Sequence, residues 1–116
     1  MNKVIFRGNI ANDIDKRVTK DGKDVATFNI AIRRDFKNNE GKYEADFVKC
    51  VAFGNNAALI NKYFQKGSGI IVEGQLRSGS YEKNNEKVYT TEVMVERIEF
   101  VDKKEKEPET GYELPF

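Results

Sequence analysis

The sequence predicts an all-β fold, in which five strands form a barrel and one helix lies between the third and fourth strands. Apolar and polar residues alternate along several segments, which is the period of a half-buried strand. Glycines occur inside these segments, where they often mark a bulge or a bend. Only one segment has a helical period. This layout is that of an OB-fold barrel, although a meander sheet with one packed helix would give a similar pattern.

The strand segments follow from this alternation and from the turns between them. Gly8 lies inside the first segment and Gly74 inside the fourth. The Asp-Gly pair at 21–22 is a strong hairpin signal before the second segment. The predicted strands are residues 2–10, 25–36, 43–53, 68–82 and 88–101.

The helix is predicted over residues 55–66, where the period changes. One helical face carries Ala57, Ile60, Tyr63 and Phe64. Both aromatic residues of this face are therefore assigned to the core. Asn55 or Asn56 can cap the start of the helix, and Gly67 follows its end.

Composition narrows the class of protein. The 116 residues suffice for one domain, and 39% are hydrophobic while 34% are charged. No apolar run approaches a membrane span of about 20 residues, and the N-terminus lacks the apolar centre of a signal peptide. The lone cysteine, Cys50, has no internal disulfide partner, which is typical of a reducing compartment. We expect a cytoplasmic protein without membrane association.

The composition also argues against catalysis. The chain has no histidine and one cysteine, which removes the commonest general base and makes a zinc site improbable. No phosphate-binding or nucleophile motif occurs. We expect no enzymatic activity, no metal and no cofactor. Residues 1–101 carry a net charge of +3, which taken alone is weak support for a polyanionic partner.

Residues 102–116 differ from residues 1–101. They carry a net charge of −2 and have low hydrophobicity, so we expect a flexible acidic tail after a single domain at 1–101. The tail nevertheless ends on Leu114, Pro115 and Phe116. Two large apolar side chains beside Glu113 suit a small apolar pocket with basic surroundings on another protein, and the terminal carboxylate adds a second charged contact.

Aromatic residues next to cations point to nucleic acid. In the segment 43–53, small apolar residues occupy one face, while Phe47, Lys49 and Phe53 share the other. Phe36 and Tyr81 stand among polar residues. Bases of single-stranded nucleic acid stack on such rings, and cations meet the phosphates. The candidate phosphate contacts are Lys3, Arg7, Arg33, Arg34, Lys49, Lys62, Arg77 and Lys87.

Each of these residues also has an ordinary interpretation. A strand aromatic is more often a core residue or a subunit contact than a base platform, and a single basic residue is usually a solvated surface charge. The pattern leaves the roles of Tyr43 and Tyr89 open. The interpretation as a binding site depends on several rings and cations occurring together on one fold.

The segments NKVIFRGNI, VATFNIAIRRDF, ADFVKCVAFGNNAALINKYFQKGSGIIVEGQLRSGSYE and VYTTEVMVERIEFV resemble the bacterial and phage single-stranded DNA-binding proteins. The resemblance covers residues 1–101 and the last three residues. It implies an OB fold, a homotetramer, and binding of single-stranded DNA without sequence preference in replication, recombination and repair. It also implies that the C-terminal tip recruits partner proteins from those processes. By position, the four stacking aromatics of the family correspond to Phe36, Phe47, Phe53 and Tyr81.

The chain departs from the family in several places. It has no tryptophan, which many members place at three of the stacking positions. Asp13-Ile14 replaces a common Asp-Pro step, the usual linker is almost absent, and the acidic run before the terminus is thin. The short tail suits either a phage-encoded member, acting in the cytoplasm of a bacterial host, or a reduced bacterial paralogue.

Two other functions remain open at this point. An OB-fold interaction module of the primosome type would use the same surface for proteins. An OB-fold nuclease would need clustered carboxylates on a metal.

Overall fold

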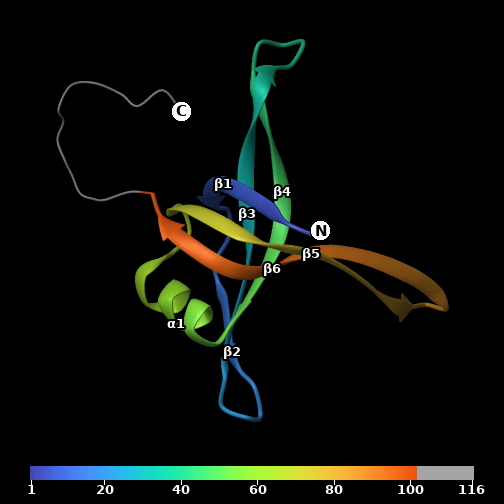
Figure 1. The fold of residues 1–116 in the computed structure, drawn as a ribbon. Helices are drawn as coiled ribbons and strands as arrows, with labels where there is room; N and C mark the ends of the chain where they lie inside the picture. Colours follow the sequence, from blue (N-terminus) through green and yellow to red (C-terminus); the bar gives the residue numbers. More distant parts are fainter. Residues whose placement is uncertain (102–116) are drawn as a thin grey trace.

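A computed structural model describes residues 1–101 as one helix and six strands (Figure 1). The elements are β1 (Val4–Ile10), β2 (Asp15–Val18), β3 (Asp24–Lys37), β4 (Tyr43–Phe53), α1 (Gly54–Tyr63), β5 (Gly69–Lys83) and β6 (Glu86–Phe100). The five long strands and the position of the helix confirm the predicted barrel. The short β2, which pairs with β3 across the Asp-Gly turn, is an additional strand that the sequence pattern does not predict. The predicted tail lies outside the described residues.

The barrel closes because β1 pairs with two strands. The sheet order is β1-β5-β6-β4-β3-β2, and β1 also pairs with β3 at Asn9 and Ile10. Gly8 lies where β1 passes from β5 to β3. A Cβ atom at Gly8 would lie 2.2 Å from the carbonyl oxygen of Ala31, so only glycine permits this approach.

A second glycine accompanies a bulge in β6. Glu73 pairs with Arg97 and Gly74 pairs with Val95, so Glu96 is an extra residue in β6. A bulge of this kind bends a strand and increases its twist. At Gly74 a Cβ atom would lie 2.1 Å from the carbonyl oxygen of Met94, which explains the absence of a side chain at this bend.

The core fills the barrel and the space under the helix. Its members are apolar residues that point inward from the strands, together with three from α1 and its C-terminal end. They are Ile10, Ala26, Phe28, Ile30, Cys50, Ala52, Ala57, Ile60, Phe64, Ile70, Val72, Val93 and Val95. The prediction that the small residues of β4 face the interior is confirmed.

The helix differs from the prediction in its start and in one aromatic residue. It begins at Gly54, whose φ of 65° lies in the region that favours glycine, and Phe53 caps it without a side-chain hydrogen bond. Asn56 instead donates from Nδ2 to the carbonyl oxygen of Glu96, 3.1 Å away. The predicted cap by Asn55 or Asn56 is therefore wrong, because the helix begins before both residues, and the Asn56 side chain instead connects α1 to β6.

The assignment of both helix aromatics to the core is half correct. Phe64 is buried, while Tyr63 is 55% exposed. Phe64 lies just past the end of α1, so the chain can turn it inward. Its ring stacks on Phe100 at 4.8 Å, and Tyr63 meets the edge of the same ring at 5.8 Å.

Two hairpins extend from the barrel as arms (Figure 1). One consists of the distal parts of β3 and β4, and the other of the distal parts of β5 and β6. The second arm ends in a two-residue turn at Asn84 and Asn85, both with positive φ, as a tight hairpin requires. Within residues 1–101, no helix is long and apolar enough to cross a membrane.

Candidate nucleic-acid interface

The outer face of β4 presents the two phenylalanines that the sequence analysis placed there. Phe47 is 65% exposed and Phe53 is 45% exposed, while Cys50 and Ala52 between them are fully buried on the other face. Val51 also points outward but is buried, between Thr27 of β3 and Met94 of β6 in the sheet register. Exposed rings on a sheet surface are available for stacking on flat ligands.

A row of charged side chains crosses this face. Lys49 pairs in register with Glu92, and Glu92 with Arg77, so one cation from β4 and one from β5 flank a carboxylate of β6. The Lys49 Nζ lies 3.6 Å from the Glu92 Oε1. We name the outward residues Phe47, Lys49, Phe53, Arg77, Tyr81 and Glu92 the candidate binding face.

Tyr81 belongs to this face and Lys87 does not. Side chains alternate along β5, and Tyr81 is four residues from Arg77, so the two share a face. Tyr81 is 52% exposed. Lys87 is in register with Glu82 and therefore lies on the opposite face of the arm, where its Nζ is 5.8 Å from the ring centre of Tyr89.

The predicted arginine pair of β3 is divided between the two faces of the other arm. Arg33 is in register with Ala45, on the same face as Phe47. Arg34 points the other way, toward Glu44 at 3.1 Å and Asp46 at 2.8 Å. The hydrogen bonds that Arg34 donates lower the pKa of Asp46. Arg34 thus already has carboxylate partners away from the candidate binding face.

Phe36 lies on the arm formed by β3 and β4. The register between these strands shifts between Arg33 and Lys37, and Phe36 falls inside this irregularity with 84% of its surface exposed. Phe36 is more exposed than Phe47, so neighbouring side chains leave its ring open to a ligand. The structure keeps all four candidate rings accessible.

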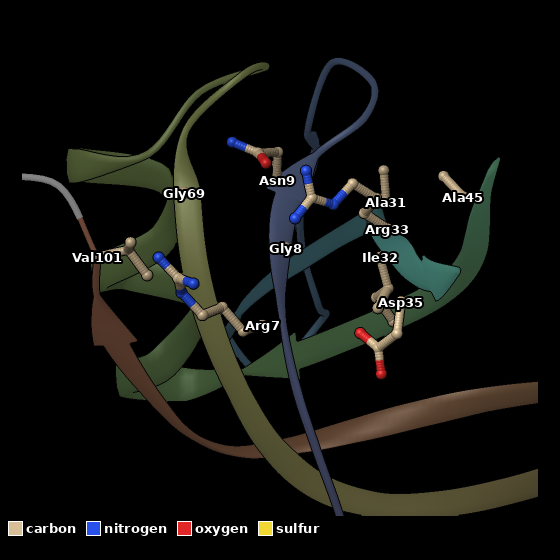
Figure 2. A pocket seen from close by; sticks show the side chains of 10 residues that line it. All are labelled: Arg7, Gly8, Asn9, Ala31, Ile32, Arg33, Asp35, Ala45, Gly69 and Val101. Atoms are coloured by element: carbon tan, nitrogen blue, oxygen red, sulfur yellow. The ribbon is translucent and has the colours of Figure 1, made fainter. Parts of the chain in front are cut away.

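A hollow of about 620 Å³ opens where β1 meets β3 (Figure 2). Arg7 and Arg33 line it from two strands, and Figure 2 shows Arg7 reaching toward Val101 and Arg33 toward Asn9. One carboxylate, Asp35, lines it as well. The hollow therefore has a net positive lining, which suits an anionic group such as a phosphate.

Lys3 and Lys62 have local partners. The Lys3 ammonium lies 3.0 Å from Glu96 and 3.1 Å from Glu73, and its hydrogen bonds to these two carboxylates raise its pKa. Lys62 lies in the last turn of α1, where a cation favours the helix, with Nζ 5.1 Å from the ring centre of Tyr63. Both cations therefore already have partners within the chain.

The sequence pattern does not predict Glu92 as a member of the candidate binding face, and it leaves the role of Tyr43 open. Glu92 lies on this face because β6 pairs with β4 and β5, and no local sequence signal indicates that pairing. Tyr43 lies under the guanidinium of Arg33, whose Cζ is 4.6 Å from the ring centre. Within residues 1–101, no group of three or more cysteine, histidine or carboxylate side chains is placed to hold a metal ion.

Comparisons with known proteins place this chain in one family. Residues 1–101 match the single-strand binding protein family, and the chain belongs to it. This is a class of non-enzymatic binding proteins.

Individual relatives agree with this assignment. The chain is 38% identical over 112 residues to single-stranded DNA-binding protein 1 of Staphylococcus aureus (strain COL), covering 96% of this chain and 67% of the relative. It is 41% identical over 103 residues to the single-stranded DNA-binding protein of Bacillus cereus, covering 88% of this chain and 61% of the relative. The chain thus spans about three fifths to two thirds of the length of these relatives.

A solved structure has the same fold. The Plasmodium falciparum SSB in complex with single-stranded DNA superposes with a TM-score of 0.80 at 28% identity. The match covers 88% of this chain and 96% of that chain.

Proposed function

We propose that this chain binds single-stranded DNA without sequence preference and coats it during replication, recombination and repair. The observation that carries the proposal is the candidate binding face: Phe47, Phe53 and Tyr81 are exposed beside Lys49 and Arg77 on one sheet surface. Rings stack on any base and cations meet the backbone, so such a face does not require a particular sequence. The DNA complex of a structural neighbour supports the same function.

The test compares ligands at two salt concentrations. The chain should bind oligo-dT far more tightly than duplex DNA of the same length, because stacked bases of a duplex cannot reach the rings. Affinity should fall with salt, with a slope of about −0.7 per phosphate contact on a single strand. Equal affinity for both ligands, or an affinity that salt leaves unchanged, would contradict the proposal.

We propose further that the chain assembles as a homotetramer. Over Val4–Phe6, β1 pairs with β5 on one edge, and its pairing with β3 begins only at Asn9. Within residues 1–101 the other edge of Val4–Phe6 pairs with no strand, and Ile5 beside it is 64% exposed. An open edge of this kind can pair with the same edge of a second copy about a two-fold axis. A monomer by light scattering at micromolar concentration would disprove this assembly.

Two further proposals concern the C-terminal residues, which lie outside the described part of the chain, and the cellular location of the protein. We propose that Glu113–Phe116 bind replication, recombination and repair proteins, because an apolar tip with acidic neighbours suits a basic-rimmed pocket. We also propose a bacterial cytoplasmic location, supported by the bacterial relatives.

A further inference from the structure

Tyr43 lies beside two cations of β3, on the same face of β4 as Phe47. Tyr43 is 46% exposed near the outer end of β4, and it lies on the same face as Phe47, because the two residues are four apart on one strand. The Arg33 Cζ lies 4.6 Å and the Lys37 Nζ 5.7 Å from the ring centre. Two cations from β3 therefore lie close to the ring of one half-exposed tyrosine.

Between Tyr43 and Phe47, β4 turns only one small side chain outward, and Arg33 lies beside it on β3. Ala45 is the intervening outward residue of β4, and Ala31 is the register partner of Phe47. Both alanines line the hollow at the junction of β1 and β3, together with Arg7 and Arg33 (Figure 2). About 13 Å of strand separates the two rings, at about 3.3 Å per residue. Ala45, which lies between the two rings on β4, thus borders a hollow whose charged residues, Arg7, Arg33 and Asp35, give it a net positive lining.

Tyr89 provides an internal comparison. It is also exposed, at 75%, and also lies beside a lysine. However, it is in register with Ser80 and points to the face of its arm opposite Tyr81, so it lies away from the candidate binding face. Both tyrosines are exposed and have a cation beside the ring. Of the two, only Tyr43 shares a face with Phe47 and lies close to the hollow.

We propose that Tyr43 and Arg33 form a further nucleotide subsite, which continues the path of single-stranded DNA from Phe47 across the two alanines to the arm of β3 and β4. A base stacks on Tyr43 or on the guanidinium plane held against it, and Arg33 and Lys37 meet the adjacent phosphates. This inference rests on the proposed function. It predicts that the arm contributes a base contact beyond the four aromatics of the family pattern.

The test measures oligo-dT affinity of Tyr43 variants beside a matched control. Tyr43→Ala should weaken binding by about five-fold or more, the lower end of a base–aromatic stack. Tyr43→Phe should bind like the parent because the ring is kept. Tyr89→Ala, which removes the same side chain from the other face, should also bind like the parent.

The outcomes separate this subsite from the proposed function. If the parent binds oligo-dT and Tyr43→Ala binds as well as Tyr89→Ala, the subsite is disproved while the proposed function stands. If Tyr43→Phe loses as much affinity as Tyr43→Ala, the hydroxyl rather than the stack is responsible, and the proposal fails. A thermal melt accompanies each variant. If Tyr43→Ala unfolds at a lower temperature than the parent, Tyr43→Leu takes its place in the affinity comparison. Leucine removes the ring but keeps a large apolar side chain.

Discussion

Lys49 of β4 and Glu92 of β6 form an ion pair across parallel strands, with 3.6 Å between Nζ and Oε1. Arg77 occupies the other side of Glu92 in the register. A carboxylate therefore lies between two cations on the surface that we propose for DNA. Only 24% of the Glu92 side chain is exposed, so it is held at the sheet surface.

Replacing Glu92 by Gln should strengthen binding of oligo-dT. The substitution removes a negative charge that repels phosphates and that partly neutralises Lys49. Exposed ion pairs contribute about 0–1 kcal/mol, so we expect a gain of up to about five-fold. Glu99→Gln is the matched control, since it removes the same charge from the pair with Arg97. Salt titrations of both variants measure the effect, and equal gains would show that only net charge matters.

Replacing Tyr81 by Ala should weaken DNA binding by about 1–3 kcal/mol, the value of one base–aromatic stack. Phe36→Ala, Phe47→Ala and Phe53→Ala should each lie in the same range. Tyr89→Ala changes the opposite face of the same arm and should leave affinity unchanged. Because the chain has no tryptophan, tyrosine fluorescence reports the titration. If all four variants fold and bind like the parent, the proposed stacking site is wrong.

Replacing Gly8 by Ala should destabilise the fold. The added Cβ would lie 2.2 Å from the carbonyl oxygen of Ala31, so β1 must move from the seam that closes the barrel. Overpacking of this kind costs about 1–3 kcal/mol of unfolding free energy, and sometimes more. Gly79→Ala is the control, since its Cβ would only approach the Thr90 hydroxyl at 3.3 Å. Denaturant unfolding measures both, and equal stability of the two variants would contradict this explanation.

Cys50 should react slowly with thiol reagents while the protein is folded. Burial raises the pKa of this thiol to about 12, so little reactive thiolate forms at pH 8. The unfolded thiol ionises near pH 9 and the folded thiol does not, so the unfolding free energy should fall between about pH 9 and 12. The maximum slope is about 1.4 kcal/mol per pH unit. Cys50→Ala should lose the part of this dependence that the thiol supplies, while the part from Lys3, whose pKa is also raised, should remain. Rapid labelling of the folded parent would contradict the assigned burial.

Deleting Leu114–Phe116 should separate two activities. Because the proposed rings and cations lie in residues 1–101, oligo-dT affinity and light scattering should match those of the intact chain. Binding to a helicase, nuclease or recombination mediator should be lost in pull-down assays. A deletion that cripples DNA binding, or that retains every partner, would disprove the proposed division.

The sequence was a good guide to the faces of individual strands. A period of two is a local property, so the alternation in β4 was enough to place Phe47 and Phe53 outside and Cys50 inside. It was a poorer guide at the ends of elements. Phe64 turns inward after the last helical residue while Tyr63 stays exposed, because the chain leaves the helix between them.

The tertiary structure alone decided which charges meet. Lys49 and Glu92 are 43 residues apart, and their contact depends on a parallel pairing that neither strand encodes by itself. The same holds for Arg33 and Arg34, which are adjacent in sequence but point to opposite faces of one arm. Arg33 lies over Tyr43, whereas Arg34 pairs with Asp46. By itself the sequence determined which side chains each strand turns outward. The cross-strand register, set by packing of the whole barrel and by its two close glycine approaches, determined which of them act together.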